Sequence, residues 1–241
     1  MARSRTSSTT PTSAFAHPRA VAALGRLGAV LGQVAIVTGR PVDQAVALGG
    51  FEGRPGLERL VIYGQYGAES WHADGSGGAR PERPDGIARL AELLPGWLAD
   101  RGLGDLRIED KGLAVAIHTR ESGPEALDAL REPIYRLAEE LGLSVEPGRQ
   151  VVELRAPGSN KGEAVRRLAH DLGARQIIFA GDDLGDLPAF DAVDALRADG
   201  VAGLLICSAS PEQDALVSRA DLVLAGPDAV AEWLEALADE F

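Results

Sequence analysis

The chain has 241 residues, 45% of them hydrophobic, with a formal net charge of -12 and one cysteine. A chain this apolar can bury a sizeable core, which excludes disorder over its whole length, and its negative charge argues against nucleic acid or an anionic membrane as a partner. The lone cysteine, Cys207, excludes an intrachain disulfide framework, no apolar run has the length of a membrane span, and the N-terminus has no hydrophobic signal core, so we expect a cytoplasmic protein.

The first predicted elements end in a polar turn. Residues 1–16 are rich in Ser, Thr and Arg and lack acidic residues, which predicts a disordered leader. Helical spacing predicts a helix over 18–31, and the apolar run 34–37 predicts a buried strand. Pro41 favours a helix start, so Thr38 lies beside a helix N-terminus, where free N–H groups attract anions. Its hydroxyl suits either a phosphate oxygen or a helix cap, and this segment alone does not separate the two.

A third strand, a glycine-containing turn and a linker follow. Residues 61–63 are apolar and predict a strand. The turn over 64–69 has two glycines around polar side chains, which permits close backbone approach to a ligand but is also an ordinary turn. Residues 74–86 are rich in Gly, Pro, Asp and Arg, which predicts a linker.

The middle of the chain predicts a small α+β unit with one open sheet face. Apolar spacing of period 3.6 predicts helices over 87–98 and 124–141. Apolar spacing of period 2 predicts half-buried strands over 113–117 and 151–155. His118 and Glu153 then lie on the open face, where small alanines leave room. Taken singly, each is more simply a residue of a solvated sheet face.

Three carboxylates crowd the end of the best-defined strand. The apolar run 176–179 predicts a buried strand that Gly181 ends, with a helix from Leu184. Between strand and helix lie Asp182, Asp183 and Asp186. Ligands bind at this edge of open α/β sheets, and like charges this close repel unless a cation or hydrogen bonds compensate them. All-oxygen ligands suit Mg²⁺. Capping aspartates are the alternative, but three of them after one strand favour a metal site.

The neighbouring segments complete a parallel sheet. Asn160 is a good N-cap for a helix over 163–172, which brings Lys161 to the same sheet edge. Strands and helices then alternate to the C-terminus, over 203–207, 211–217, 221–224 and 230–237. This alternation predicts an α/β fold, a Rossmann-like parallel sheet core with helices on both faces.

The order of these motifs resembles that of the haloacid-dehalogenase-like phosphatase superfamily. Its second, third and fourth motifs are matched in order by Thr38-Gly39-Arg40, Lys161-Gly162 and Gly181-Asp182-Asp183 with Asp186. The finer resemblance is to trehalose-6-phosphate phosphatases, through Gly64-Gln65-Tyr66-Gly67-Ala68-Glu69, Glu109-Asp110-Lys111-Gly112 with His118, and Glu153-Leu154-Arg155-Ala156-Pro157-Gly158-Ser159-Asn160-Lys161-Gly162. The similarity runs from about residue 15 to the end, and the shared order of the segments is more specific than any one of them.

The resemblance implies a haloacid-dehalogenase-like core over 17–72 and 157–241, with an inserted α+β cap domain over 73–156. The catalytic residues it implies are Thr38, Lys161 and Asp182. The Mg²⁺ ligands it implies are Asp182, Asp183 and Asp186. Substrate-binding residues would be Gly39, Arg40 and Gln65 from the core and Lys111, His118 and Glu153 from the cap.

The implied function is Mg²⁺-dependent hydrolysis of trehalose 6-phosphate to trehalose and phosphate, in trehalose biosynthesis. This reaction, carried out by a phosphoric monoester hydrolase, needs charge neutralisation and in-line positioning. We expect a small-molecule substrate, no nucleic acid or membrane partner, and a monomer.

The start of the chain departs from the family pattern. Relatives begin with a strand ending in Asp-x-Asp-Gly-Thr, whose first Asp attacks phosphorus and whose second protonates the leaving sugar. Here no Asp or Glu precedes Asp43, and Tyr66 stands where His is common. Residues 11–18 resemble the segment after the nucleophile strand in relatives, so we expect the chain to lack its first strand and, as written, to be inactive. A non-catalytic sugar-phosphate-binding relative and a phosphatase for another sugar phosphate remain as alternatives.

Overall fold

The computed structural model describes residues 15–120, 122–148, 150–209 and 214–241. The expected leader lies outside these residues except for its last two positions. The helices are α1 (Pro18–Gly28), α2 (Val42–Gly49), α3 (Asp85–Ala99), α4 (Pro124–Glu140), α5 (Lys161–Leu172), α6 (Leu187–Ala198), α7 (Asp214–Val217) and α8 (Gly226–Asp239), with short 3₁₀ turns η2 (Gln65–Gly67) and η3 (Leu184–Asp186). The strands are β1 (Ala35–Val37), β2 (Val61–Gly64), β3 (Glu69–His72), β4 (Arg107–Asp110), β5 (Ala114–His118), β6 (Ser144–Gly148), β7 (Val151–Arg155), β8 (Gln176–Gly181), β9 (Ala202–Ser208) and β10 (Leu222–Leu224).

One core sheet has the strand order β1-β2-β3. β1 runs parallel to β2, with Val37 opposite Tyr63, and β3 returns antiparallel with Glu69 opposite Gly64. All four residues of β2 are buried, and α2 packs against β2 and β3. β3 was not expected from the sequence, because its residues show no apolar alternation and its strand conformation comes from pairing with β2.

The second core sheet has the order β10-β9-β8, and all its strands are parallel. Gly181, the last residue of β8, lies opposite Cys207 in β9. Helices α5 and α6 pack against each other, and α6 also contacts β8 and β9. Their close approach requires a glycine, because a Cβ added at Gly162 would lie 2.2 Å from the carbonyl oxygen of Pro188.

The parallel α/β core is confirmed, but its strands form two three-stranded sheets instead of one continuous sheet. Within the described residues, β1 pairs with β2 alone and β8 pairs with β9 alone. Ile178, in the middle of β8, is 45% exposed. Strands of parallel sheets are normally buried on both faces, so this exposure shows that one face of β8 is left uncovered at Ile178, while its pairing with β9 alone makes it an edge strand of the described sheet.

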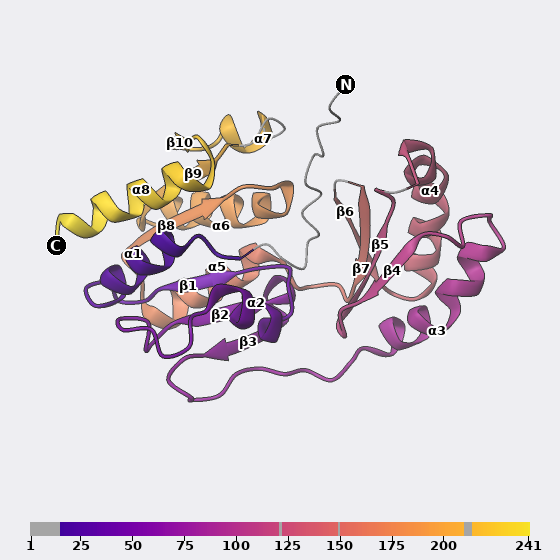
Figure 1. The fold of residues 1–241 in the computed structure, drawn as a ribbon, viewed down its shortest axis with the longest axis horizontal. Helices are drawn as coiled ribbons and strands as arrows, with labels where there is room; N and C mark the ends of the chain where they lie inside the picture. The colour runs from indigo at the N-terminus through magenta and orange to yellow at the C-terminus, as the bar shows by residue number, and fades with distance from the viewer. Residues whose placement is uncertain (1–14, 121, 149, 210–213) are drawn as a thin grey trace, which may run out of the picture.

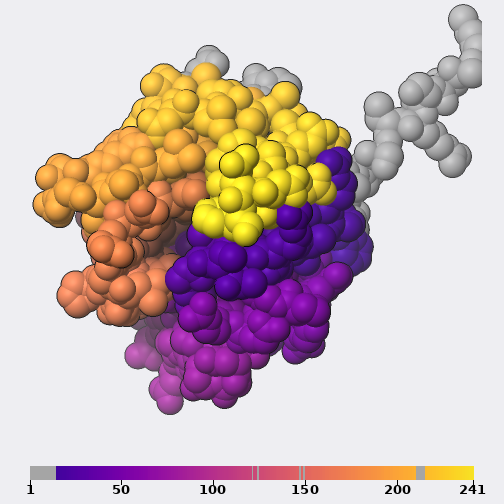
Figure 2. Space-filling view, turned by 90° about the vertical axis from the view of Figure 1, so that its left-hand side faces the viewer, coloured from indigo at the N-terminus to yellow at the C-terminus, as the bar shows by residue number. Residues whose placement is uncertain are grey.

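The two ends of the described chain pack together on one face of the core. Helix α1 lies against α8, as Figure 2 shows from the side of the core. Arg19 pairs with Glu235 at 2.5 Å and Arg26 with Asp239 at 2.7 Å. The apolar residues of α1 meanwhile turn inward, with Val21 and Leu27 buried.

The other part of the molecule, which we call the cap, consists of β4, β5, β6 and β7 with α3 and α4 (Figure 1). Its strands form an antiparallel sheet in the order β4-β5-β7-β6. One face packs on the two helices through a core that includes Leu90, Ile117, Ile134 and Leu154. The sequence did not predict β6, whose proline and glycine are unfavourable in a strand interior and which forms by pairing with β7. No described helix combines the length and apolar character needed to cross a membrane.

Candidate active site

The acidic loop, residues 182–186, continues from the carboxyl end of β8. Asp183 caps η3 in a capping box with Asp186. One carboxylate oxygen of Asp186, Oδ2, accepts hydrogen bonds from the backbone N–H groups of Asp182 at 2.9 Å and Asp183 at 3.1 Å. Asp186 is buried, while Asp182 and Asp183 are exposed. Asp186 therefore shapes the loop, and the other two carboxylates face outward.

Lys161 supplies the positive charge of this loop. It begins α5 after the N-cap Asn160, whose side chain accepts a hydrogen bond from the backbone N–H of Glu163 at 2.9 Å, as the sequence predicts. The Lys161 ammonium lies 2.6 Å from Asp186 Oδ1 and 3.8 Å from Asp183 Oδ1. Burial by itself would lower the pKa of Lys161, but these carboxylates outweigh it and raise that pKa, so the ammonium stays charged.

The exposed carboxylates form an arrangement that fits a cation. Each of the three aspartates offers an oxygen within 4.8 Å of the others. Partial desolvation, reinforced by Asp183 and Asp186, raises the pKa of Asp182. Desolvation likewise raises the pKa of Asp183 despite the opposing charge of Lys161. Anionic oxygens that repel one another, with no nitrogen or sulfur ligand among them, suit a hard divalent ion such as Mg²⁺.

Thr38 follows β1 directly and begins the turn into α2. Its amide donates to Tyr63 O at 2.9 Å, and its hydroxyl Oγ1 accepts from the backbone N–H of Arg40 at 3.2 Å. This contact lies in the turn and does not cap α2, whose N-cap is Pro41, so the hydroxyl proton is available for another acceptor such as a phosphate oxygen. The Arg40 guanidinium lies 3.5 Å from the Gln44 side-chain oxygen.

Gln65 connects the core with the cap. It is 5% exposed, and its Nε2 donates to Glu69 Oε1 at 3.2 Å. Its Oε1 accepts from the backbone N–H of Leu113, in the cap, at 3.2 Å. The resemblance implies a position near the substrate for Gln65, and its amide keeps one N–H donor and one acceptor lone pair beyond these two contacts.

The open face of the cap sheet carries the other predicted residues. Lys111 and Glu153 form an ion pair at 2.5 Å, and His118 Nε2 lies 2.7 Å from Glu109 Oε2. Ala116 lies opposite Glu153, so a small residue sits beside the carboxylate. Glu153 is 4% exposed, yet its Oε1 has no hydrogen-bond partner among the described residues. A buried acceptor without a partner is costly and fits a ligand that donates a hydrogen bond.

Arg155 and Tyr66 complete the site and were not among the predicted site residues. Arg155 follows Glu153 by two positions in β7, so the two side chains share one sheet face. Its guanidinium lies 4.9 Å from the centre of the Tyr66 ring, and its Nη2 donates to Glu146 Oε2 at 2.7 Å. The strand period of two starting at Glu153 could have identified Arg155, but the contact with Tyr66 depends on the placement of the cap.

The Tyr66 ring lies where cap, β1 turn and acidic loop meet. A Cβ added at Gly39 would lie 2.7 Å from ring carbon Cζ, so the ring packs directly on that glycine. Burial, with the added effect of Glu153, Glu146 and Asp183, raises the pKa of Tyr66 far above its ordinary value, so the phenol stays neutral. The structure thus joins Lys161 to the acidic loop and Lys111 to Glu153, with Tyr66 between these two groups.

Comparisons with known proteins point to one family. A family model described as trehalose-phosphatase matches residues 103–221. The trehalose-6-phosphate phosphatase of Escherichia coli (strain K12) is 30% identical over 208 residues, covering 85% of this chain and 71% of that protein. A crystal structure of a trehalose-6-phosphate phosphatase related protein has a TM-score of 0.72 and 25% identity, covering 96% of this chain and 91% of that one.

Other relatives are longer than the region they share with this chain. The trehalose-phosphate phosphatase of Mycobacterium avium (strain 104) is 30% identical over 230 residues, which are 92% of this chain and 56% of that protein. The shared region is 44% of a Thermoplasma acidophilum relative and 12% of two from Mycobacterium tuberculosis.

Proposed function

The chain belongs to the trehalose-phosphatase family, and from that premise we propose that its site binds trehalose 6-phosphate and serves Mg²⁺-dependent hydrolysis of the phosphate ester. One observation carries this proposal above the others. The Lys161–Asp186 ion pair, at 2.6 Å, anchors a loop whose remaining carboxylates are exposed. A buried cation beside outward-facing carboxylates offers both charges that phosphoryl transfer requires, one for the phosphoryl oxygens and one for a metal ion.

Thr38 and Lys161 are proposed to hold the phosphoryl group. The Thr38 hydroxyl keeps its proton for a phosphate oxygen, because the N–H of Arg40 already donates to its oxygen. The Lys161 ammonium has three donors, of which Asp186 takes one in the present arrangement. Positioning by these two donors would orient the ester for in-line attack.

Asp182 and Asp183 are proposed to hold Mg²⁺, with Asp186 fixing their backbone through its two amide contacts. When bound, Mg²⁺ would neutralise charge on the phosphoryl oxygens. Asp186 is less suited to direct ligation, because one of its oxygens faces Lys161 and the other accepts two backbone N–H groups.

The cap, over 73–156 between core segments 17–72 and 157–241, is proposed to recognise the sugar. Lys111 and His118 offer donors, and Glu153 offers a buried oxygen that has no partner among the described side chains. Hydroxyl groups of a disaccharide both donate and accept, so they match such a set.

The attacking carboxylate is proposed to come from an additional strand beside β1 or β8. The segment after β1 carries the Thr38 hydroxyl, and the segment after β8 carries the acidic loop. No Asp or Glu precedes Asp43, so no carboxylate comes from the part of the chain before Thr38. The single pairing of β1 and β8 in the described part of the chain and the exposed Ile178 support this location.

The test compares the 241-residue chain with a version extended at its N-terminus by an apolar strand ending in Asp-x-Asp-Gly-Thr. Trehalose 6-phosphate binding is measured by calorimetry and phosphate release is measured with Mg²⁺ and with EDTA. We expect both versions to bind and the extended one alone to turn over, in Mg²⁺ only. Binding without turnover in the extended version would favour the non-catalytic alternative, and no binding by either version would refute the proposed substrate.

A further inference from the structure

Tyr66 is held in an unusual backbone conformation at the centre of the site. Its φ is 60° and its ψ is 27°, the left-handed region that a bulky side chain rarely adopts, and Gln65 before it also has a positive φ of 45°. Such conformations persist where the surroundings hold them, and they concentrate at functional positions. The surroundings are identifiable here, because the Tyr66 amide donates to Thr38 O at 2.9 Å and the ring packs on Gly39.

The ring also reaches the acidic loop. A Cβ added at Gly185 would lie 3.7 Å from ring carbon Cε1 of Tyr66 and 3.0 Å from Asp183 Oδ1. The first distance is an ordinary van der Waals contact, so the ring and the Asp183 carboxylate both lie beside the backbone of Gly185. Tyr66 thus touches the turn after β1 and the loop after β8, the two places where the proposed phosphate and metal contacts lie.

Arg155 contacts the ring from the cap. Its side chain is 13% exposed, its guanidinium lies 4.9 Å from the ring centre, and Glu146 of β6 holds it at 2.7 Å. Its Nε is buried and has no hydrogen-bond partner among the described residues. Strand β6 itself packs against η3 of the acidic loop. A cation over the face of a neutral, buried aromatic ring is attracted more strongly than one in water.

We propose that Tyr66 and Arg155 are positioning residues that act as a pair, fixing the sugar-facing side of the cap relative to the acidic loop. Because Arg155 and Glu153 share one face of β7, holding Arg155 against Tyr66 also sets where the Glu153 carboxylate lies above the core. This inference deepens the proposed function and rests on it. In this inference, the Tyr66–Arg155 contact sets how far the sugar-binding groups of the cap lie from the phosphate-binding groups of the core.

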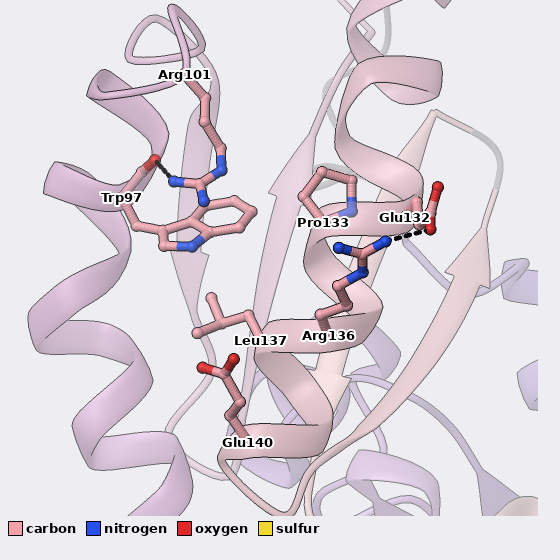
Figure 3. Close-up of a pocket in the computed structure, with 7 residues that line it drawn as sticks. All are labelled: Trp97, Arg101, Glu132, Pro133, Arg136, Leu137 and Glu140. Carbon is pink, nitrogen blue, oxygen red and sulfur yellow. Dashed lines mark hydrogen bonds and ion pairs between the residues drawn. The ribbon is translucent and has the colours of Figure 1, made fainter.

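The test uses variants that remove the contact from either side. Tyr66→Leu removes the ring, Arg155→Met removes the charge, and Tyr66→Phe keeps the ring as a conservative control. Arg101→Met is the matched control, because Arg101 lies 3.9 Å from the centre of the Trp97 ring but both residues belong to the cap, as Figure 3 shows.

Two measurements are made on the full chain. Hydrogen exchange without ligand follows residues 144–148 and 182–186, and calorimetry in Mg²⁺ compares trehalose 6-phosphate with inorganic phosphate. Tyr66→Leu and Arg155→Met should speed exchange in both segments and weaken trehalose 6-phosphate binding by about tenfold, the range of a desolvated cation–π contact. Phosphate affinity should stay within about twofold, and the double variant should be no weaker than the worse single variant.

The outcomes separate this inference from the proposed function. If the parent chain binds no trehalose 6-phosphate, the proposed function fails, and the exchange data still decide whether the pair positions the cap. Unchanged exchange in Tyr66→Leu and Arg155→Met would overturn the inference. So would equal losses for phosphate and trehalose 6-phosphate, additive losses in the double variant, or the same changes in Arg101→Met.

Discussion

Removing the Asp186 carboxylate should destabilise the core more than any other single change in the acidic loop. Asp186 is 3% exposed and faces Lys161, which is 7% exposed, at 2.6 Å. Taking one partner from a buried ion pair leaves an uncompensated charge, which typically costs about 3–5 kcal/mol of unfolding free energy. Asp183 remains 3.8 Å from the ammonium, so we expect Asp186→Ala to fall at the lower end, about 3 kcal/mol.

The assay is urea and thermal unfolding, followed by circular dichroism and tryptophan fluorescence, with agreement between the two probes checked first. For a chain of this length, about 3 kcal/mol corresponds to a fall of roughly 6–12 °C in melting temperature. The matched control is Asp182→Ala in the same loop. Its side chain is exposed, so its unfolding free energy should change by no more than about 0.5 kcal/mol.

A second variant tests the cause of the loss. Lys161→Met with Asp186→Leu removes both charges and replaces them with apolar side chains, and such replacements of buried pairs are often nearly neutral. The double variant should therefore recover the part of the loss that comes from the uncompensated Lys161 charge, but not the part that comes from the backbone N–H groups of Asp182 and Asp183, which lose their acceptor in both variants. A cost below about 1 kcal/mol for Asp186→Ala, or a double variant as unstable as the single one, would refute the assignment of this pair as the anchor of the loop.

Further predictions concern activity and pH, with activity measured in the strand-extended version. Asp182→Asn should lower Mg²⁺-dependent turnover by at least about 100-fold while leaving the melting temperature unchanged, and wild-type turnover at limiting Mg²⁺ would contradict the metal assignment. Glu153→Ala should lower kcat/KM for trehalose 6-phosphate by about 10- to 100-fold, yet change that for a small aryl phosphate little; equal losses would mean that the cap does not read the sugar. Burial, aided by Arg107 and Lys111 and opposed by Glu109, lowers the pKa of His118. Below the ordinary histidine pKa of about 6.5, His118 therefore binds more protons in the unfolded chain than in the folded one, so the unfolding free energy falls as pH drops. His118→Gln should reduce this dependence of the unfolding free energy on pH, measured from about pH 7.5 to about pH 5.5.

Local patterns in the sequence determined the best-defined parts of the site. The apolar run 176–179 followed by Gly181 formed β8 and placed Asp182 at its carboxyl end. Asn160 proved to be the N-cap of α5 and put Lys161 in the first turn of that helix. These features depend on residues within one turn or one strand, where apolar spacing and helix capping determine the local backbone conformation.

Pairing between distant segments determined two strands and the division into sheets, which the apolar periodicity of the sequence did not predict. β3 and β6 have no strong strand pattern of their own and exist because β2 and β7 offer them hydrogen bonds. The expected single sheet became two three-stranded sheets, since strand order depends on which edges meet and not on the sequence of any one strand.

The side-chain partners in the site were also set by tertiary structure. Gln65, expected at the substrate, also donates to Glu69 and accepts from the backbone of Leu113, while Tyr66 and Arg155 meet across the boundary between core and cap. The sequence determines which groups each strand presents and on which face, because side-chain direction follows backbone period. Only the packing of cap on core determines which of those groups meet, because that contact joins surfaces far apart along the chain.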